Sequence, residues 1–136
     1  MNISVLQEQG RVPVTVFRVE GQLDGQNYQS LIDTAREAYE GGARDFLLDL
    51  GGLTYISSAG LVALHTVALL ARGEPLPDTE AGWSAIHSVA NADRSAVQKH
   101  VKLLNPREEI QSVLDMVGFS AAFEIHTDFN AAVQSF

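Results

Sequence analysis

Two adjacent hydroxyl groups at the start of a long apolar stretch are the most distinctive chemical feature of the sequence. Ser57 and Ser58 are followed by Ala59, Gly60 and an almost wholly apolar run to residue 72. A helix N-terminus presents free N–H groups and the positive end of the helix dipole, so a phosphate attached to either serine is electrostatically tolerated there. Serine is also a common helix cap. The residues alone leave both a regulatory phosphosite and a simple cap open.

Catalytic motifs are otherwise missing. The sequence has no phosphate-binding P-loop and no G-x-G-x-x-G after a strand. A nucleophile elbow of the form G-x-S-x-G would need a glycine where Ile56 stands before Ser58. The four histidines lack the spacing of metal ligands: His65, His87, His100 and His126. We therefore expect no catalytic residue, metal or cofactor, and a hydrolase that uses Ser58 remains a hypothesis requiring a histidine close to it in space.

The composition narrows the function classes further. The 136 residues include 9 Lys+Arg against 17 Asp+Glu, a net charge of −8, and no cysteine. An acidic surface repels phosphate backbones, which argues against nucleic acid and anionic membranes as partners. The lack of cysteine excludes disulfides, thiolate metal sites and cysteine nucleophiles. Because no stretch suits a membrane helix or a signal peptide, we expect a cytoplasmic protein with protein partners.

Strands and helices alternate around the two serines. Two β-rich segments near the N-terminus predict a strand pair, and apolar spacing predicts an amphipathic helix over residues 28–39. Residues 45–50 are typical of a buried parallel strand, which a tight loop joins to the serine-bearing helix. Residues 101–104 predict a further strand, and Asn105 is the expected cap of a helix that ends at Gly118. A short strand at 123–126 and a final helix from about residue 127 complete the chain.

This order predicts an α/β fold, a mixed sheet of about five strands with helices packed against it, in a single domain over residues 1–136. Residues 73–97 do not fit, because connections of about 2–6 residues are usual. They predict an atypical insertion, within which residues 82–90 could form a short helix. Its Trp83 either anchors an interface or fixes the insertion to the core.

The segment over residues 49–64 resembles the signature of STAS domains, the fold of anti-sigma factor antagonists. Further similarities follow the family's order, and they are Gly21-Gln22-Leu23-Asp24 before the first helix, Val101-Lys102-Leu103-Leu104-Asn105-Pro106 at the penultimate strand, and Gly118-Phe119 with residues 123–136 at the end. The resemblance covers nearly the whole chain, with residues 73–97 outside it. It implies the STAS fold, with a mixed sheet and helices.

The resemblance also implies a partner-switching regulator of bacterial transcription. Such a protein binds an anti-sigma factor, often a serine kinase of the histidine-kinase-like ATPase fold, and thereby frees a sigma factor. The kinase phosphorylates a hydroxyl between the strand and the second helix, and a PP2C-type phosphatase removes the phosphate. A phosphate adds about −1.5 to −2 charge at the centre of the docking surface, where like charge and desolvation oppose association.

Alignment on Gly60 places Ala59 at the family's usual acceptor position. Alanine has no hydroxyl, so the resemblance implies phosphorylation of Ser58, or of Ser57, or docking without a phosphorylation switch. The residues it implies for partner binding are Asp24, Gly25, Asn27, Ser57, Ser58, Ala59, Gly60, Leu61 and Val62. Asp24 or Asn27 could instead cap the first helix, and Asp49 could serve only to hydrogen-bond the loop that follows it.

A second function class shares the same fold. The chain could be a non-catalytic STAS subunit of a transporter or lipid-trafficking complex that docks permanently on an ATPase. A stress-signalling assembly without a phosphorylation switch is a further form of the same alternative. Genes for a kinase or phosphatase beside this one would favour the first class, and transporter genes would favour the second.

Overall fold

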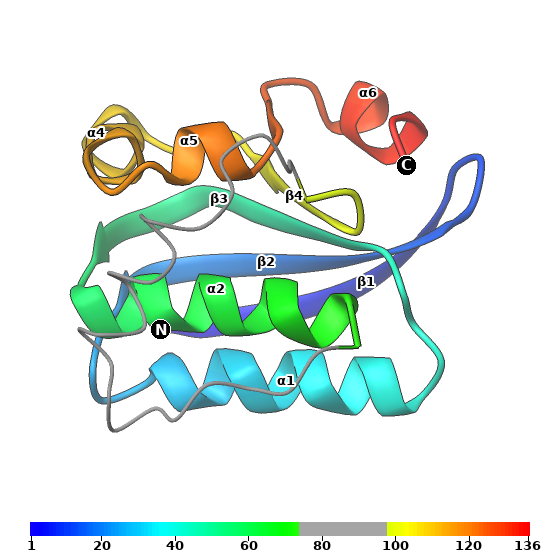
Figure 1. Cartoon of the computed structure of the whole chain (residues 1–136), viewed down its shortest axis with the longest axis horizontal. Helices are drawn as coiled ribbons and strands as arrows, with labels where there is room; N and C mark the ends of the chain where they lie inside the picture. The colour runs from blue at the N-terminus through cyan, green and yellow to red at the C-terminus, as the bar shows by residue number, and fades with distance from the viewer. Residues whose placement is uncertain (74–97) are drawn as a thin grey trace.

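A computed structural model describes residues 1–73 and 98–136, which form one mixed β-sheet with helices on both faces (Figure 1). The strands are β1 (Asn2–Gln9), β2 (Pro13–Leu23), β3 (Phe46–Ile56), β4 (Val101–Leu104) and β5 (Ile125–His126). The helices are α1 (Tyr28–Glu40), α2 (Ser58–Ala71), α4 (Glu108–Met116), α5 (Phe119–Ala122) and α6 (Phe129–Gln134). No helix among these residues is long and apolar enough to cross a membrane.

The strands lie in the order β1-β2-β3-β4-β5. The first two form an antiparallel hairpin, and each later strand runs parallel to its neighbour. Parallel neighbours need crossover connections, and helices supply them. The predicted α/β fold with a mixed five-stranded sheet is confirmed.

Alternating strand residues build two separate cores. Phe17, Phe46 and Leu48 belong to the larger core, which also contains buried residues of α1, α2, α4 and α5. Val16 and Leu47 point to the opposite face, where α6 contributes Ala132 and Val133 to a smaller core. Because successive side chains of a strand point to opposite faces, the same strands serve both cores.

The nearly apolar helix predicted after Ser58 is α2, and this domain itself covers it. It packs beside α1 and against β3 and β4. Its residues from Gly60 to Leu64 are buried, as are Val67 and Ala68. The predicted amphipathic helix is α1, which buries Leu31, Ile32 and Ala35.

Strand β3 is longer than the sequence predicted. The tight loop expected after residue 50 is wrong, because β3 continues to Ile56 and stays paired with β2 as far as Leu23. A Cβ at position 52 would lie 2.7 Å from Cγ of the exposed Glu20, so any other residue there would require this side chain to move. Leu53 and Ile56 then enter the core.

The cap predicted at Asn105 is also wrong. Asn105 has a φ of 51°, and α4 begins at Glu108 with Arg107 as its N-cap. An N-cap residue is normally extended, and the left-handed backbone of Asn105 does not fit that position. Arg107 is held extended while its Nε donates to the carbonyl oxygen of Gly51 at 3.0 Å. The predicted helix of the insertion, with Trp83, lies outside the described residues.

Candidate functional site

Two chain turns meet where β2 and β3 end and α1 and α2 begin, at the left of Figure 1. Leu23 pairs with Ile56 in the sheet, and the backbone N–H of Ser57 donates to the carbonyl oxygen of Leu23 at 2.9 Å. The parallel pairing therefore brings together the two segments that the sequence predicted as a partner surface. We call residues 22–27 and 55–59 the docking end.

Close packing at Gly60 holds the two turns together. A Cβ at this position would lie 2.7 Å from Ile56 Cγ1 and 2.8 Å from the carbonyl oxygen of Leu23. Carbon atoms do not approach other heavy atoms so closely without a shift of one of them. Glycine at position 60 is therefore required for the first turn of α2 to lie against the end of β2.

The two serines have different environments. Ser57 is extended, with φ −94° and ψ 178°, and its Oγ accepts a hydrogen bond from the Gly60 N–H at 3.3 Å. Ser57 is thus the N-cap of α2, and it is half-buried. Ser58 is the first residue of the helix and is exposed, and its hydroxyl makes no hydrogen bond within the described part of the chain.

The remaining predicted contact residues of α2 are partly or fully buried. Ala59 is half-buried, and Gly60 is buried. Leu61 and Val62 belong to the larger core, with 4% and 1% of their surface exposed. Gly60, Leu61 and Val62 therefore support the docking end from inside the domain and offer a partner little accessible surface.

The turn between β2 and α1 is braced by its own side chains. Asp24 Oδ1 accepts from the Gln26 N–H at 3.0 Å, and Asn27 Oδ1 accepts from the Asp24 N–H at 2.9 Å. Asn27 Nδ2 donates to the carbonyl oxygen of Gln22 at 2.7 Å. Asn27 occupies the N-cap position of α1 without a side-chain cap bond, so the polar groups fix the turn itself. Gly25 is exposed at its tip.

Asp49 lies away from the docking end and has local partners. Its Oδ2 accepts from Arg18 Nε at 3.2 Å, and its Oδ1 accepts from the Gly51 N–H at 3.0 Å. The alternative that this carboxylate hydrogen-bonds the residues following it is therefore confirmed.

The histidines of residues 1–73 and 98–136 are not placed to activate Ser58. The carbonyl oxygen of His100 accepts from the N–H of Phe46, at the start of β3. Ile56, at the end of β3 beside Ser58, is ten residues further on, or about 30 Å along the strand. His65 follows Ser58 by two turns of α2, or about 10 Å of helical rise. His126 pairs with Leu104, which in turn pairs with Asp49, seven residues before the end of β3 at Ile56. His87 lies outside the described residues.

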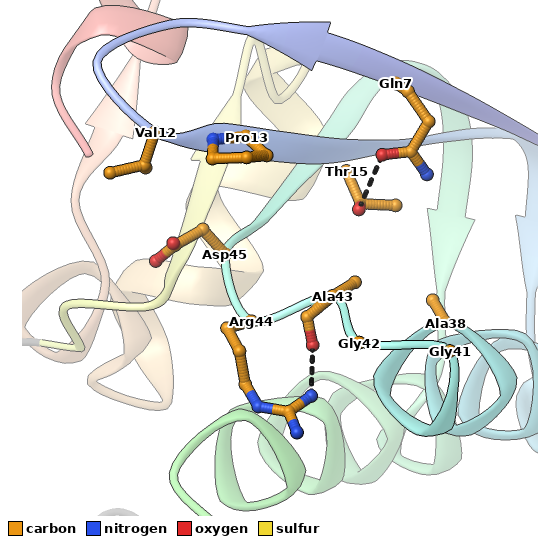
Figure 2. A pocket seen from close by; sticks show the side chains of 10 residues that line it. All are labelled: Gln7, Val12, Pro13, Thr15, Ala38, Gly41, Gly42, Ala43, Arg44 and Asp45. Carbon is orange, nitrogen blue, oxygen red and sulfur yellow. Dashed lines mark hydrogen bonds between the residues drawn. The ribbon is translucent and has the colours of Figure 1, made fainter.

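We next consider groups of possible metal ligands and the position of the described hollow relative to the docking end. Within the part of the chain that the structure describes, no group of three His, Asp or Glu side chains is placed to hold a metal ion. A hollow of about 670 Å³ lies at the opposite end of the sheet, between the start of β2 and the end of α1 (Figure 2). Figure 2 shows Gln7 and Thr15 joined by a hydrogen bond on one side of it and Arg44 on the other. No residue of the docking end lines this hollow.

One exposed residue of the docking end was not singled out from the sequence. Tyr55 is 50% exposed, beside Ser57 and Ser58. Alternation from the buried Leu53 predicts that Tyr55 points inward. An extra residue in β3 reverses this direction, and no pattern in the sequence reveals it.

The fold is that of a small α/β module, with Gly25, Tyr55 and Ser58 exposed where β2 and β3 end. The chain belongs to the STAS domain family, since the family model described as MlaB, STAS domain, matches residues 6–77, more than half of the sequence. No curated protein sequence matches it significantly.

Solved structures of anti-sigma factor antagonists share this fold. One from Mycobacterium paratuberculosis has a TM-score of 0.65 and 16% identity, and the match covers 98% of this chain and 93% of that one. Unphosphorylated SpoIIAA has a TM-score of 0.53 and 15% identity, with 96% and 92% covered. The phosphorylated form of SpoIIAA, a Bacillus cell fate determinant, has a TM-score of 0.52 and 16% identity, with 95% and 96% covered.

Proposed function

We propose that this chain is a partner-switching regulator, an anti-sigma factor antagonist without catalytic activity of its own. Its partner is an anti-sigma factor that is also a serine kinase of the histidine-kinase-like ATPase fold, and it acts in the cytoplasm. The chain is a single STAS domain with an insertion at about residues 73–97. The observation that carries the proposal is the fold, which matches anti-sigma factor antagonists over nearly the whole chain.

The docking end is the surface that we assign to the partner. Gly25 and Ser58 are exposed there, and Asp24, Asn27 and Ser57 are half-buried beside them. The hydrogen bonds within the turn before α1 support this choice, because a surface fixed in advance loses little conformational entropy when it binds. Buried residues beneath it, from Gly60 to Val62, hold it in place.

Ser58 is the acceptor if docking is switched by phosphorylation. The Ser57 hydroxyl is engaged as the helix cap, whereas the Ser58 hydroxyl is exposed. A phosphate on the first residue of α2 would face the positive end of the helix dipole, so the domain itself tolerates it. The same dianion would oppose a partner that must exclude water from this surface. A PP2C-type phosphatase would restore binding.

The switch is tested with a purified serine kinase of the histidine-kinase-like ATPase fold from the same organism. After incubation with ATP, we expect mass spectrometry to find one phosphate on Ser58. Calorimetry should show that Ser58→Asp weakens binding at least tenfold, while Ser58→Ala binds like the wild type. A phosphate on neither serine would remove the switch and leave a regulator that works by docking alone. No measurable binding of the unmodified chain would contradict the proposed function itself.

A second candidate is a non-catalytic STAS subunit of a transporter or lipid-trafficking complex. The observation that favours it is the family model that matches the chain, which is described as MlaB and not as an anti-sigma factor antagonist. Ala59 at the usual acceptor position agrees with permanent docking. Copurification with a transporter ATPase, stable and unaffected by ATP, would favour this candidate over the first.

A further inference from the structure

Tyr55 combines size, exposure and position in a way that no other described residue does. Four large apolar side chains are exposed in the described part of the chain, and they are Met1, Val5, Tyr55 and Met116. Tyr55 is the aromatic one, and it lies three residues before Ser58 in the docking end. Its ring and hydroxyl have no hydrogen bond or ring contact among residues 1–73 and 98–136.

A local irregularity of β3 turns this ring outward. Gly21 pairs with Leu53, but the next residue of β2, Gln22, pairs with Tyr55, so Thr54 is an extra residue in β3. Thr54 Oγ1 donates to the carbonyl oxygen of Gly21 at 3.0 Å and thereby stabilises the bulge. Bulges commonly redirect a side chain next to a functional site. Here Ile56 enters the core instead of Tyr55, and half of the Tyr55 surface stays exposed.

The two segments that form the docking end carry few charged residues along the sequence. Residues 20–27 and 52–62 contain two charged residues, Glu20 and Asp24, although the whole chain has a net charge of −8. The Asp24 Oδ1 accepts from the Gln26 N–H, so this carboxylate also braces its own turn. The cores of protein interfaces are depleted in charge and enriched in aromatic residues, and tyrosine is among the commonest energetic anchors.

We propose that Tyr55 is the anchor of the docking end and that the partner presents an apolar recess that receives its ring. This inference rests on the proposed function, because it concerns the same surface and the same partner. It also explains how a phosphate on Ser58 blocks binding: a dianion three residues from the ring would have to lose its water when the recess closes over Tyr55, and desolvation of a charge is costly.

Calorimetry with the purified partner kinase tests the anchor. We expect Tyr55→Ala to weaken binding at least tenfold, as truncation of an aromatic anchor does. Tyr55→Phe should stay within about threefold of the wild type, because it keeps the ring that the recess receives. Met116→Ala is the matched control, since Met116 is 85% exposed on α4 and should not affect binding. The urea midpoint of Met116→Ala should equal that of the wild type. Each variant is titrated where its own urea curve shows it to be folded, because half of the Tyr55 surface is buried.

Salt dependence gives a second measurement. An apolar recess predicts an affinity that changes less than about threefold between 0.1 and 0.5 M NaCl, whereas contacts between exposed charges are strongly screened over this range. Wild-type binding with an unchanged affinity for Tyr55→Ala would refute the anchor and leave the proposed function standing. Equal losses for Tyr55→Phe and Tyr55→Ala, or a tenfold loss in salt, would refute the apolar recess. Absence of wild-type binding would refute the proposed function and the anchor with it.

Discussion

Replacing Gly60 by alanine should destabilise the fold, because the new methyl group has no room. Its Cβ would lie 2.7 Å from Ile56 Cγ1, 2.8 Å from the carbonyl oxygen of Leu23 and 3.0 Å from Leu23 Cγ. That oxygen already accepts the hydrogen bond from the Ser57 N–H. The first turn of α2 must therefore move away from β2, and the bond that joins the two turns must lengthen or break.

The size of the effect follows from three contributions. Overpacking of a dense core costs about 1–3 kcal/mol, and the clash with a backbone oxygen places Gly60→Ala in the upper half of that range. Weakening of the hydrogen bond between Ser57 and Leu23 costs about 1 kcal/mol more. Alanine returns about 1 kcal/mol through its helix propensity. The expected loss is about 2–3 kcal/mol of unfolding free energy, or about 7–10 °C in Tm for a domain of this size.

Urea unfolding followed by circular dichroism measures this loss, and Gly25→Ala is the matched control. Gly25 lies in the same docking end, and a Cβ there would meet nothing within 4 Å. Its replacement should change the unfolding free energy by less than about 0.5 kcal/mol. If Gly60→Ala proves as stable as the wild type, the close approach of α2 to the end of β2 is not a feature of the folded protein.

Two further predictions concern single side chains. Ser57→Ala should lose about 1 kcal/mol of unfolding free energy because it removes the cap of α2, whereas Ser58→Ala should stay within about 0.5 kcal/mol of the wild type in urea unfolding. Hydrogen bonds from Ser120 and then from Gln111 lower the pKa of the Asp115 carboxyl. A lowered pKa favours the folded state above the unfolded pKa, and this contribution disappears as the pH falls through the folded value. The stability difference between the wild type and Asp115→Asn should therefore be present at neutral pH and vanish in strong acid, and a difference independent of pH would contradict the assignment.

Local signals in the sequence predicted much of the fold. The spacing of apolar residues predicted α1, which buries Leu31, Ile32 and Ala35. The final helix begins as expected, with Asp128 Oδ2 accepting from the Ala131 N–H as its N-cap. Gly118 ends α4 in the left-handed conformation, with a φ of 83°. Each of these features depends on residues within one or two helical turns, which a sequence pattern can represent.

Local sequence patterns could not tell the roles of two adjacent serines apart. Ser57 and Ser58 are chemically identical in the sequence, and either could cap α2. The distinction comes from the sheet, since the backbone N–H of Ser57 is bound to the carbonyl oxygen of Leu23 and this bond holds Ser57 extended. Ser58 then becomes the first helical residue. The role of each hydroxyl is thus decided by a residue more than thirty positions earlier in the chain.

The direction of the Tyr55 side chain also depends on a distant part of the chain, because it is set by the pairing of β3 with β2. For this reason the sequence predicted the docking end without Tyr55. A strict alternation from Leu53 would bury Tyr55 and expose Ile56. The extra residue Thr54 reverses both, and its side chain bonds to Gly21 of the neighbouring strand. The irregular pairing that the sequence pattern missed therefore presents an aromatic ring at the docking end. Since a regular strand would have buried that ring, the bulge is the structural reason that Tyr55 is exposed at this end of the sheet.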